Sequence, residues 1–286
     1  MSGEVGPFYK SIAELRKLYE VGETTPTDVT KLFLDRIQRY DDRLLSYATV
    51  LHETAIDQAA IFSEELRNGQ VRGPLHGIPL AVKDLCDMSG VATMGGTAVL
   101  EQNIPTTDST VIERLQRAGA IILGKLNLTE GAMGGYNPRR KVPKNPWNLA
   151  KWAGSSSSGS GVATAAGLCV GSLGSDTGGS IRFPSAACGI VGLKPSYGRV
   201  SRFGVLDLAE TLDHVGPMTR SVSDAVEIFK CIAGYDDKDL TTKNEKIPSF
   251  DFEIKGDLSE VVLGYSSDYC EKGVNTALVE RVLKAK

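Results

Sequence analysis

The chain has few of the residues on which many hydrolases depend. Its three histidines, His52, His76 and His214, form no H-x-x-H or H-E-x-x-H pair, so the sequence offers no ligand set for a catalytic zinc ion. No serine stands in the G-x-S-x-G turn that is typical of α/β-hydrolases. These absences argue against a metal-dependent hydrolase and against most Ser-His-Asp enzymes, and we predict neither a metal nor another cofactor.

Charge and long apolar runs are also scarce. The net charge is only −3, so no basic footprint predicts direct binding to nucleic acid. No apolar run approaches the roughly 20 residues of a membrane span, and the first residues have neither the basic start nor the apolar centre of a secretory signal. The five cysteines are irregularly spaced and lack a C-x-x-C pair, which indicates reduced thiols. We therefore expect a cytoplasmic protein without a membrane partner.

What the sequence does contain is short turns rich in glycine and serine. The stretch 171–184 has small residues at Thr177, Gly178 and Gly179, immediately before Ser180. Such a run lets successive backbone N–H groups point at one spot, where they can bind a developing oxyanion. Taken alone, the run is equally typical of a glycine turn that joins a buried strand to a helix.

Two further stretches favour a catalytic interpretation. The turn 153–161 is again small and rich in hydroxyl groups, and it includes Ser156. The stretch 77–84 has the pattern of a buried strand whose last residues present Lys83. One lysine and two serines on three separate turns are the components of a Ser-Ser-Lys nucleophile system.

Together the three stretches resemble the amidase signature family, amide hydrolases that include fatty acid amide hydrolase, peptide amidases, malonamidase and the glutaminase component of the tRNA-dependent amidotransferase. The resemblance runs from about Ser11 to the end of the chain. It implies an α/β fold in which a mixed, largely parallel twisted sheet is flanked by helices, in a single domain over 1–286. We expect a helical lead-in over about 8–70, a catalytic core over about 74–234 and a charged excursion over about 235–257.

The resemblance also assigns catalytic roles. Ser180 corresponds to the acylated nucleophile, Ser156, 24 residues earlier, to the bridging serine, and Lys83 to the general base. A cis peptide bond is implied beside Ser156. The backbone oxyanion hole corresponds to Thr177, Gly178, Gly179 and Ser180.

Supporting residues follow from the same resemblance. Asp176 and Arg182 correspond to the pair that braces the turn around the nucleophile. Ser157 either hydrogen-bonds to Lys83 or caps the helix that follows it. The chain departs from the family at Ser155, where glycine is usual, and a glycine there can supply a positive φ that a Cβ disfavours.

This chemistry requires an unprotonated lysine. A free lysine with a pKa near 10.4 is almost entirely charged at neutral pH, whereas burial lowers that pKa by up to about 3–5 units. The apolar residues 78–82 supply such burial for Lys83. We therefore expect neutral Lys83 to draw a proton from Ser156, which in turn deprotonates Ser180 for attack on an amide.

Three other residues offer alternative chemistry. Lys125 follows a second predicted buried strand and is a rival general base. His214 adjoins Asp213, which leaves a histidine-based triad open, although the following Val-Gly-Pro has the character of a packed turn. Cys169 lies in a G-x-C-x-G run that mimics a nucleophile elbow, but its apolar flanks predict a buried thiol.

Hydrophobic periodicity and capping residues predict alternating helices and strands. Residues 133–152, with two tryptophans and a basic cluster at 139–141, form either a solvated loop or the rim of a substrate pocket. The helix starting at 222 is expected to have a Ser221–Asp224 capping box. The predicted helices cover 12–19, 26 onward, 53–67, 109 onward, 160–168, 183–187, 222–233 and 274 onward, and the predicted strands cover 44–51, 78–83, 120–123, 170–173, 189–193 and 261–264.

The chain ends within its last predicted helix, and family members usually run on further, so we expect it to be an N-terminal portion of such a domain. Three functions stay open. The first is an amidase that hydrolyses a small-molecule amide through an acyl-serine intermediate. The second is the glutaminase (A) subunit of a tRNA-dependent amidotransferase, which needs a partner protein and ATP, although the loop 136–143 departs from that subunit's pattern. The third is an inactive fragment or interaction module. The sequence names no acyl or amine group and leaves a homodimer open.

Overall fold

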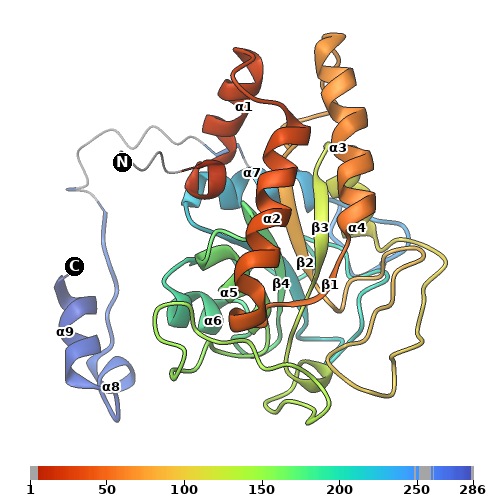
Figure 1. Cartoon of the computed structure of the whole chain (residues 1–286). Helices are drawn as coiled ribbons and strands as arrows, with labels where there is room; N and C mark the ends of the chain where they lie inside the picture. Colours follow the sequence, from red (N-terminus) through yellow and green to blue (C-terminus); the bar gives the residue numbers. More distant parts are fainter. Residues whose placement is uncertain (1–5, 248, 251–258, 260, 285–286) are drawn as a thin grey trace. The chain divides into compact units, whose positions relative to one another are not determined.

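The computed structural model describes residues 6–247, 249–250, 259 and 261–284 (Figure 1). The chain divides into two compact units, one ending at Pro248 and the other starting at Ser249. Every residue predicted to take part in catalysis lies in the first unit. None of the described helices combines the length and the apolar character that crossing a membrane requires.

The centre of the first unit is a parallel arrangement of three strands. β2 (Pro79–Lys83) lies between β3 (Ile121–Leu126) and β4 (Gly171–Asp176) and runs parallel to both. Because the three strands run in one direction, their carboxyl-terminal ends share one edge of the sheet.

Antiparallel strands complete the sheet, whose order over the described residues is β1-β3-β2-β4-β6-β5. β1 (Tyr47–Val50) pairs with β3, while β6 (His214–Thr219) pairs with both β4 and the short β5 (Val191–Gly192). The predicted mixed and largely parallel sheet flanked by helices is therefore confirmed.

Helices pack on this sheet and on one another. Figure 1 shows α2 and α3 side by side, and both contact β3. α5 contacts the central strands, whereas α7 packs against α4, β5 and β6. The bounds are η1 Pro7–Tyr9, α1 Ile12–Glu20, α2 Pro26–Leu44, α3 His52–Arg67, α4 Thr110–Arg117, η2 Glu130–Ala132, α5 Ser158–Ala165, α6 Arg182–Cys188 and α7 Val222–Ile232, with α8 Ser267–Cys270 and α9 Thr276–Lys284 in the second unit.

Side-chain caps fix where several helices begin. Ser11 and Glu14 form a complete capping box at α1. At α7 the predicted box is only half formed. The Ser221 hydroxyl accepts a hydrogen bond from the Asp224 N–H, but the Asp224 carboxylate accepts one from the Ile12 N–H at 2.9 Å. That carboxylate joins α7 to α1 instead of closing its own cap.

α5 lies unusually close to the sheet because it is built from small residues. A Cβ on Gly159 would lie 2.4 Å from the carbonyl oxygen of Asn127 and 2.6 Å from that of Ser46. Only glycine permits this approach. The close packing holds the start of α5, and therefore Ser156 and Ser157 just before it, against the strands.

The central strands supply much of the apolar core. Leu80, Val82 and Ile122 are at most 1% exposed, and burying such side chains contributes about 1.5–3 kcal/mol each. The same strands carry Lys83 and Lys125, which are 1% and 0% exposed. The fold thus places two amines in an interior that disfavours charge.

Three strands differ from the sequence prediction. The strand expected over 189–193 is limited to Val191–Gly192. The expected strand over 261–264 does not form, and its valines and leucine are 57–92% exposed, without a partner strand in the described part of the chain. β6 was not predicted as a strand because Pro217 argues against a central strand, yet Pro217 lies opposite Leu173 of β4.

The start of the predicted charged excursion packs onto the first unit. The Asp236 side chain is 6% exposed and accepts hydrogen bonds from the hydroxyls of Thr110 at 2.6 Å and Ser201 at 2.5 Å. Thr242 is buried as well. Of the rest of that stretch, residues 248 and 251–257 lie outside the described residues.

Candidate active site

The three segments predicted to carry catalytic residues meet at the carboxyl-terminal ends of β2 and β4. The Lys83 Nζ donates hydrogen bonds to the Ser156 Oγ at 2.6 Å and to the Ser175 Oγ at 2.8 Å. All three side chains are buried. One predicted contact, between the lysine and the bridging serine, is therefore present in the structure.

The Lys83 amine lies in surroundings that favour its neutral form. Burial lowers the pKa of Lys83 to about 7, against the opposing influence of Cys86, Asp176 and Asp213. An amine with that pKa is unprotonated in about half of the molecules at neutral pH. Lys83 can therefore accept a proton under ordinary conditions.

Ser175 was not predicted from the sequence. It lies on β4 directly before Asp176, and its hydroxyl is the second acceptor for the Lys83 amine. The signal that could have revealed it is the parallel pairing of β2 with β4. That pairing brings the ends of the two strands to the same edge of the sheet.

The turn before α5 is tied to the end of β4. The Ser157 hydroxyl donates to the Ser175 carbonyl at 3.1 Å and accepts from the Ser175 N–H at 3.2 Å, and the Ser157 N–H donates to the Ser180 carbonyl at 3.3 Å. Ser157 precedes α5 but its side chain caps no N–H of that helix. Neither expected role of Ser157 is therefore observed, because its hydroxyl is used to join two turns.

The backbone of the serine turn agrees with the implied cis bond, which is the peptide between Ser155 and Ser156. The positive φ of this turn belongs to Gly154, at 83°, and not to Ser155. A Cβ on Gly154 would lie 2.4 Å from the Cα of Pro184. The replacement of the usual glycine by Ser155 therefore requires no left-handed conformation.

The turn that carries Ser180 is organised by the Asp176 carboxylate. This buried group accepts hydrogen bonds from the N–H groups of Gly179 at 2.8 Å and Ile181 at 3.1 Å, and from the Arg182 guanidinium at 3.0 and 3.1 Å. Burial alone raises the pKa of Asp176, but these hydrogen bonds outweigh it and lower that pKa to about 2. Asp176 and Arg182 thus hold the turn as a pair, and Ser180 itself is half-buried.

The same contacts change the set of free backbone donors. The Gly179 N–H is engaged by Asp176, so it is not directed at a substrate in this structure. The N–H groups of Thr177, Gly178 and Ser180 donate no hydrogen bond to any described residue. The Thr177 hydroxyl donates to the Asp213 carboxylate. Three donors beside Ser180 therefore remain for an oxyanion.

Within the described residues, the hydroxyls of Ser156 and Ser180 are not joined by a hydrogen bond. The two turns are nevertheless adjacent through the Ser157–Ser180 backbone contact. Catalytic hydrogen bonds are often long without substrate and tighten in the complex. The proton relay from Ser180 to Ser156 stays a prediction.

The rival residues lie in surroundings unsuited to the roles considered for them. Lys125 is 3.0 Å from the Asp84 carboxylate and donates to the Thr93 hydroxyl at 2.9 Å. The His214 Nδ1 lies 2.6 Å from the Leu212 carbonyl, and the neighbouring Asp213 carboxylate accepts from other groups, so the suggested His-Asp pair is not formed. Burial raises the pKa of the Cys169 thiol to about 11, as expected for a core cysteine.

The loop 133–152 is both exposed and adjacent to the site. Trp147 and Trp152 are 74% and 50% exposed. The Trp147 Nε1 donates to the Cys188 carbonyl at 2.7 Å, and the Trp152 ring packs edge-on against Phe183, with ring centroids 4.8 Å apart. Since Phe183 belongs to α6, which follows the Ser180 turn, this loop borders the candidate site.

The chain belongs to the amidase family, whose model matches residues 28–286. It is 49% identical over 239 residues to the Mycobacterium tuberculosis protein named "Putative amidase AmiD", and the match covers 84% of this chain and 50% of that relative. It is 42% identical over 281 residues to the glutaminase component of the glutamyl-tRNA(Gln) amidotransferase of Syntrophobacter fumaroxidans, and this match covers 98% of this chain and 58% of the relative.

Solved structures show the same architecture. The native peptide amidase from Stenotrophomonas maltophilia superimposes with a TM-score of 0.81 at 37% identity, over 85% of this chain and 52% of that one. The chain thus spans between half and three-fifths of the length of the relatives described here.

Proposed function

We propose that this chain carries the reacting groups of an amidase that hydrolyses a carboxylic acid amide through an acyl-serine intermediate. The observation that supports this most is the 2.6 Å hydrogen bond between the buried Lys83 amine and the Ser156 hydroxyl. A pKa of about 7 makes that amine a competent base at neutral pH. Membership of the amidase family supports the same reaction class.

The first step is attack by the Ser180 hydroxyl on the amide carbonyl. Ser156 accepts the proton that Ser180 loses while it passes its own proton to neutral Lys83. The carbonyl oxygen becomes an oxyanion, which the N–H groups of Thr177, Gly178 and Ser180 stabilise. Each such donor typically lowers the barrier by about 2.7–4 kcal/mol.

The second step expels the amine. The tetrahedral intermediate breaks its C–N bond while the relay runs in reverse, so that the proton from Lys83 reaches the leaving nitrogen through Ser156. Water then attacks the ester on Ser180 by the same route and releases the carboxylic acid. Asp176 and Arg182 act indirectly, by holding the turn in which the three donors and the nucleophile converge.

A glutaminase of a tRNA-dependent amidotransferase is the second candidate. It is favoured by the 42% identity to such a component over 98% of this chain. The same Ser-Ser-Lys chemistry would then release ammonia from glutamine. Glutamine hydrolysis that rises when the partner proteins are added supports this candidate, and no response to them counts against it.

A fluorophosphonate probe tests the reaction class directly, because it labels activated serines. We expect mass spectrometry to find the label on Ser180, and Ser180→Ala to remove it. Ser155→Ala, a change at an unreactive serine of the same site, is the matched control and should keep the label. Labelling of another residue, or no labelling, contradicts the proposal and favours an inactive fragment or interaction module. A panel of aryl and aliphatic amides then identifies the substrate.

A further inference from the structure

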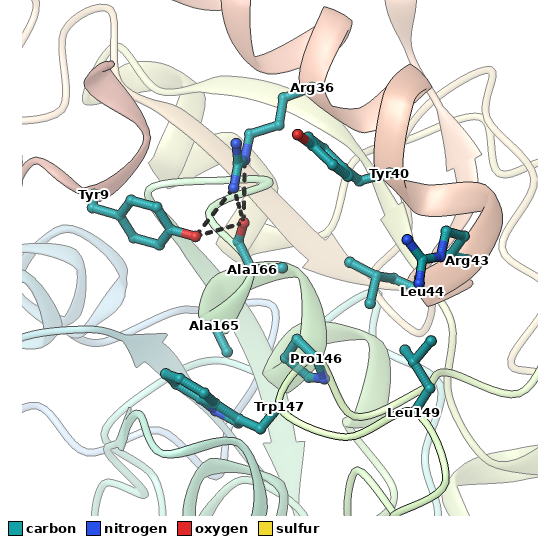
Figure 2. A pocket seen from close by; sticks show the side chains of 10 residues that line it. All are labelled: Tyr9, Arg36, Tyr40, Arg43, Leu44, Pro146, Trp147, Leu149, Ala165 and Ala166. Atoms are coloured by element: carbon teal, nitrogen blue, oxygen red, sulfur yellow. Dashed lines mark hydrogen bonds between the residues drawn. The ribbon is translucent and has the colours of Figure 1, made fainter. Parts of the chain in front are cut away.

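A cavity of about 390 Å³ lies in the first unit, apart from the residues proposed for catalysis. Figure 2 shows side chains from α2, from η1, from the end of α5 and from the loop 146–149 around it. Its volume is at the lower end of the range, about 300–1,000 Å³, that is typical of small-molecule sites.

The length of α5 separates this cavity from the candidate active site. Ser156 and Ser157 lie just before the first residue of α5, whereas Ala165 and Ala166 at its far end line the cavity. Eight helical residues at about 1.5 Å each span roughly 12 Å. A ligand in the cavity is therefore not a substrate positioned for attack by Ser180.

The cavity carries positive charge without a matching acid. Arg36 and Arg43 project from α2, and none of the residues that line the cavity is acidic (Figure 2). Arg36 donates to the Ala166 carbonyl at 3.1 and 3.2 Å and to the Tyr9 hydroxyl at 3.1 Å. Neither guanidinium forms an ion pair with a carboxylate of the described residues.

One of these cations is held rigidly. The Arg36 guanidinium lies 4.6 Å from the centre of the Phe8 ring and 4.9 Å from that of the Tyr40 ring. Such stacking, together with the bonds to Ala166 and Tyr9, fixes the guanidinium before any ligand arrives. A fixed cation loses little conformational freedom on binding. Arg43, by contrast, is exposed and can adjust to a ligand.

The walls of the cavity are largely apolar. The Tyr40 and Trp147 rings and the Leu44 and Leu149 side chains contribute to them. A strongly hydrated inorganic anion gains little from such walls, whereas a singly charged anion with an apolar body can use both the guanidinium groups and the rings. The fork of a guanidinium also matches the two oxygens of a carboxylate.

We propose that this cavity binds a small organic carboxylate with an aromatic body, at a site separate from the catalytic residues. Arg43, with Arg36 behind it, engages the carboxylate, and the ring lies between Tyr40 and Trp147. This assignment does not depend on the proposed amidase activity, since none of these residues takes part in it.

Tryptophan fluorescence tests the assignment, with benzoate as the probe and benzyl alcohol as its neutral counterpart. The chain has only two tryptophans, so Trp152→Phe leaves Trp147 as the sole reporter. We expect a saturable change with benzoate and at least about tenfold weaker binding of benzyl alcohol, because charge-assisted hydrogen bonds are lost. If the fluorescence does not change, saturation-transfer NMR with benzoate decides, and no transfer there overturns the proposal.

Charge-removing variants locate the ligand. Arg43→Gln should weaken benzoate about tenfold and leave benzyl alcohol unchanged. The matched control is Lys31→Gln, which removes an exposed charge from the same helix outside the cavity and should leave benzoate binding intact. Benzoate affinity that is unchanged in Arg43→Gln, or reduced equally by Lys31→Gln, contradicts the assignment.

Discussion

The two buried lysines of the central sheet occupy similar positions along neighbouring strands but have different partners. Lys83 ends β2 and Lys125 lies near the end of β3, and both are at most 1% exposed. Lys125 lies 3.0 Å from the Asp84 carboxylate. Lys83 has the hydroxyls of Ser156 and Ser175 as its hydrogen-bond acceptors. Burial of a lysine therefore does not by itself define a catalytic base, because the partner decides which protonation state the interior tolerates.

The physical reason is the cost of transferring a charge from water to the protein interior. A carboxylate partner offsets much of that cost, so the pair remains ionised. A hydroxyl partner offsets less, and the amine responds by releasing its proton near neutral pH. We therefore expect Lys83 to control reactivity and Lys125 to control stability, and the following experiments examine that division.

The largest expected effect is the loss of acylation in Lys83→Met, which keeps the volume of the side chain but removes the amine. General-base catalysis contributes about 10²–10⁴-fold, so labelling of Ser180 by a fluorophosphonate should slow by that factor. Thermal unfolding followed by circular dichroism is the control and should show no loss of stability. A rate within about threefold of the unmodified chain contradicts the assignment of Lys83 as base.

The next largest effect is the loss of stability in Lys125→Met. Removing one partner of a buried ion pair typically costs about 3–5 kcal/mol, because the Asp84 carboxylate is left uncompensated. Denaturant unfolding measures this change. The double variant Lys125→Met/Asp84→Leu should recover a large part of the loss, since no buried charge remains. If Lys125→Met instead abolishes acylation and leaves stability unchanged, the roles of the two lysines are reversed.

A smaller, graded effect is the pH dependence of acylation. Because neutral Lys83 is the active form and its pKa is about 7, the rate should rise about tenfold per pH unit below 7 and level off above it. The folded chain releases this proton near pH 7, whereas the unfolded chain retains it to about 10.5. Stability relative to Lys83→Met should therefore increase as pH rises from 7 to 10.5. A rate that is flat between pH 5 and 8 argues against this account.

The smallest expected effect belongs to Ser175, a positioning residue. Ser175→Ala removes one of the two acceptors of Lys83, and a hydrogen bond of this kind is worth about 0.5–1.5 kcal/mol, or roughly two- to tenfold in rate. Because that acceptor stabilises the ammonium, its loss should also move the inflection of the pH profile to lower pH. Ser175→Thr keeps the hydroxyl and should restore both values. An unshifted inflection in Ser175→Ala indicates a merely structural role.

Much of the fold could be predicted because local signals and tertiary packing agree. The capping pair Ser11 and Glu14, the Thr25-Pro26 start of α2 and the apolar runs of β2 and β3 each produced the expected element. The apolar run at 261–264 had no partner strand in the described residues, and an apolar run alone does not specify pairing. Pro217 concealed β6, because a proline is unexpected inside a sheet.

The candidate site was less predictable than the identity of its residues. The sequence motifs led to Lys83, Ser156 and Ser180, but Ser175 became visible only through the pairing of β2 with β4. Competition for hydrogen bonds was equally hidden. The Gly179 N–H is bound by Asp176, and the Ser157 hydroxyl by the backbone of Ser175. Such choices among nearby acceptors depend on tertiary geometry that residue spacing does not encode.

The most direct test of this account is an NMR titration of the lysine side chains, with the Lys83 resonance assigned by its absence in Lys83→Met. The account predicts that this resonance titrates near pH 7. A Lys83 amine that stays protonated up to pH 10 would contradict the proposal that it takes the proton from Ser156.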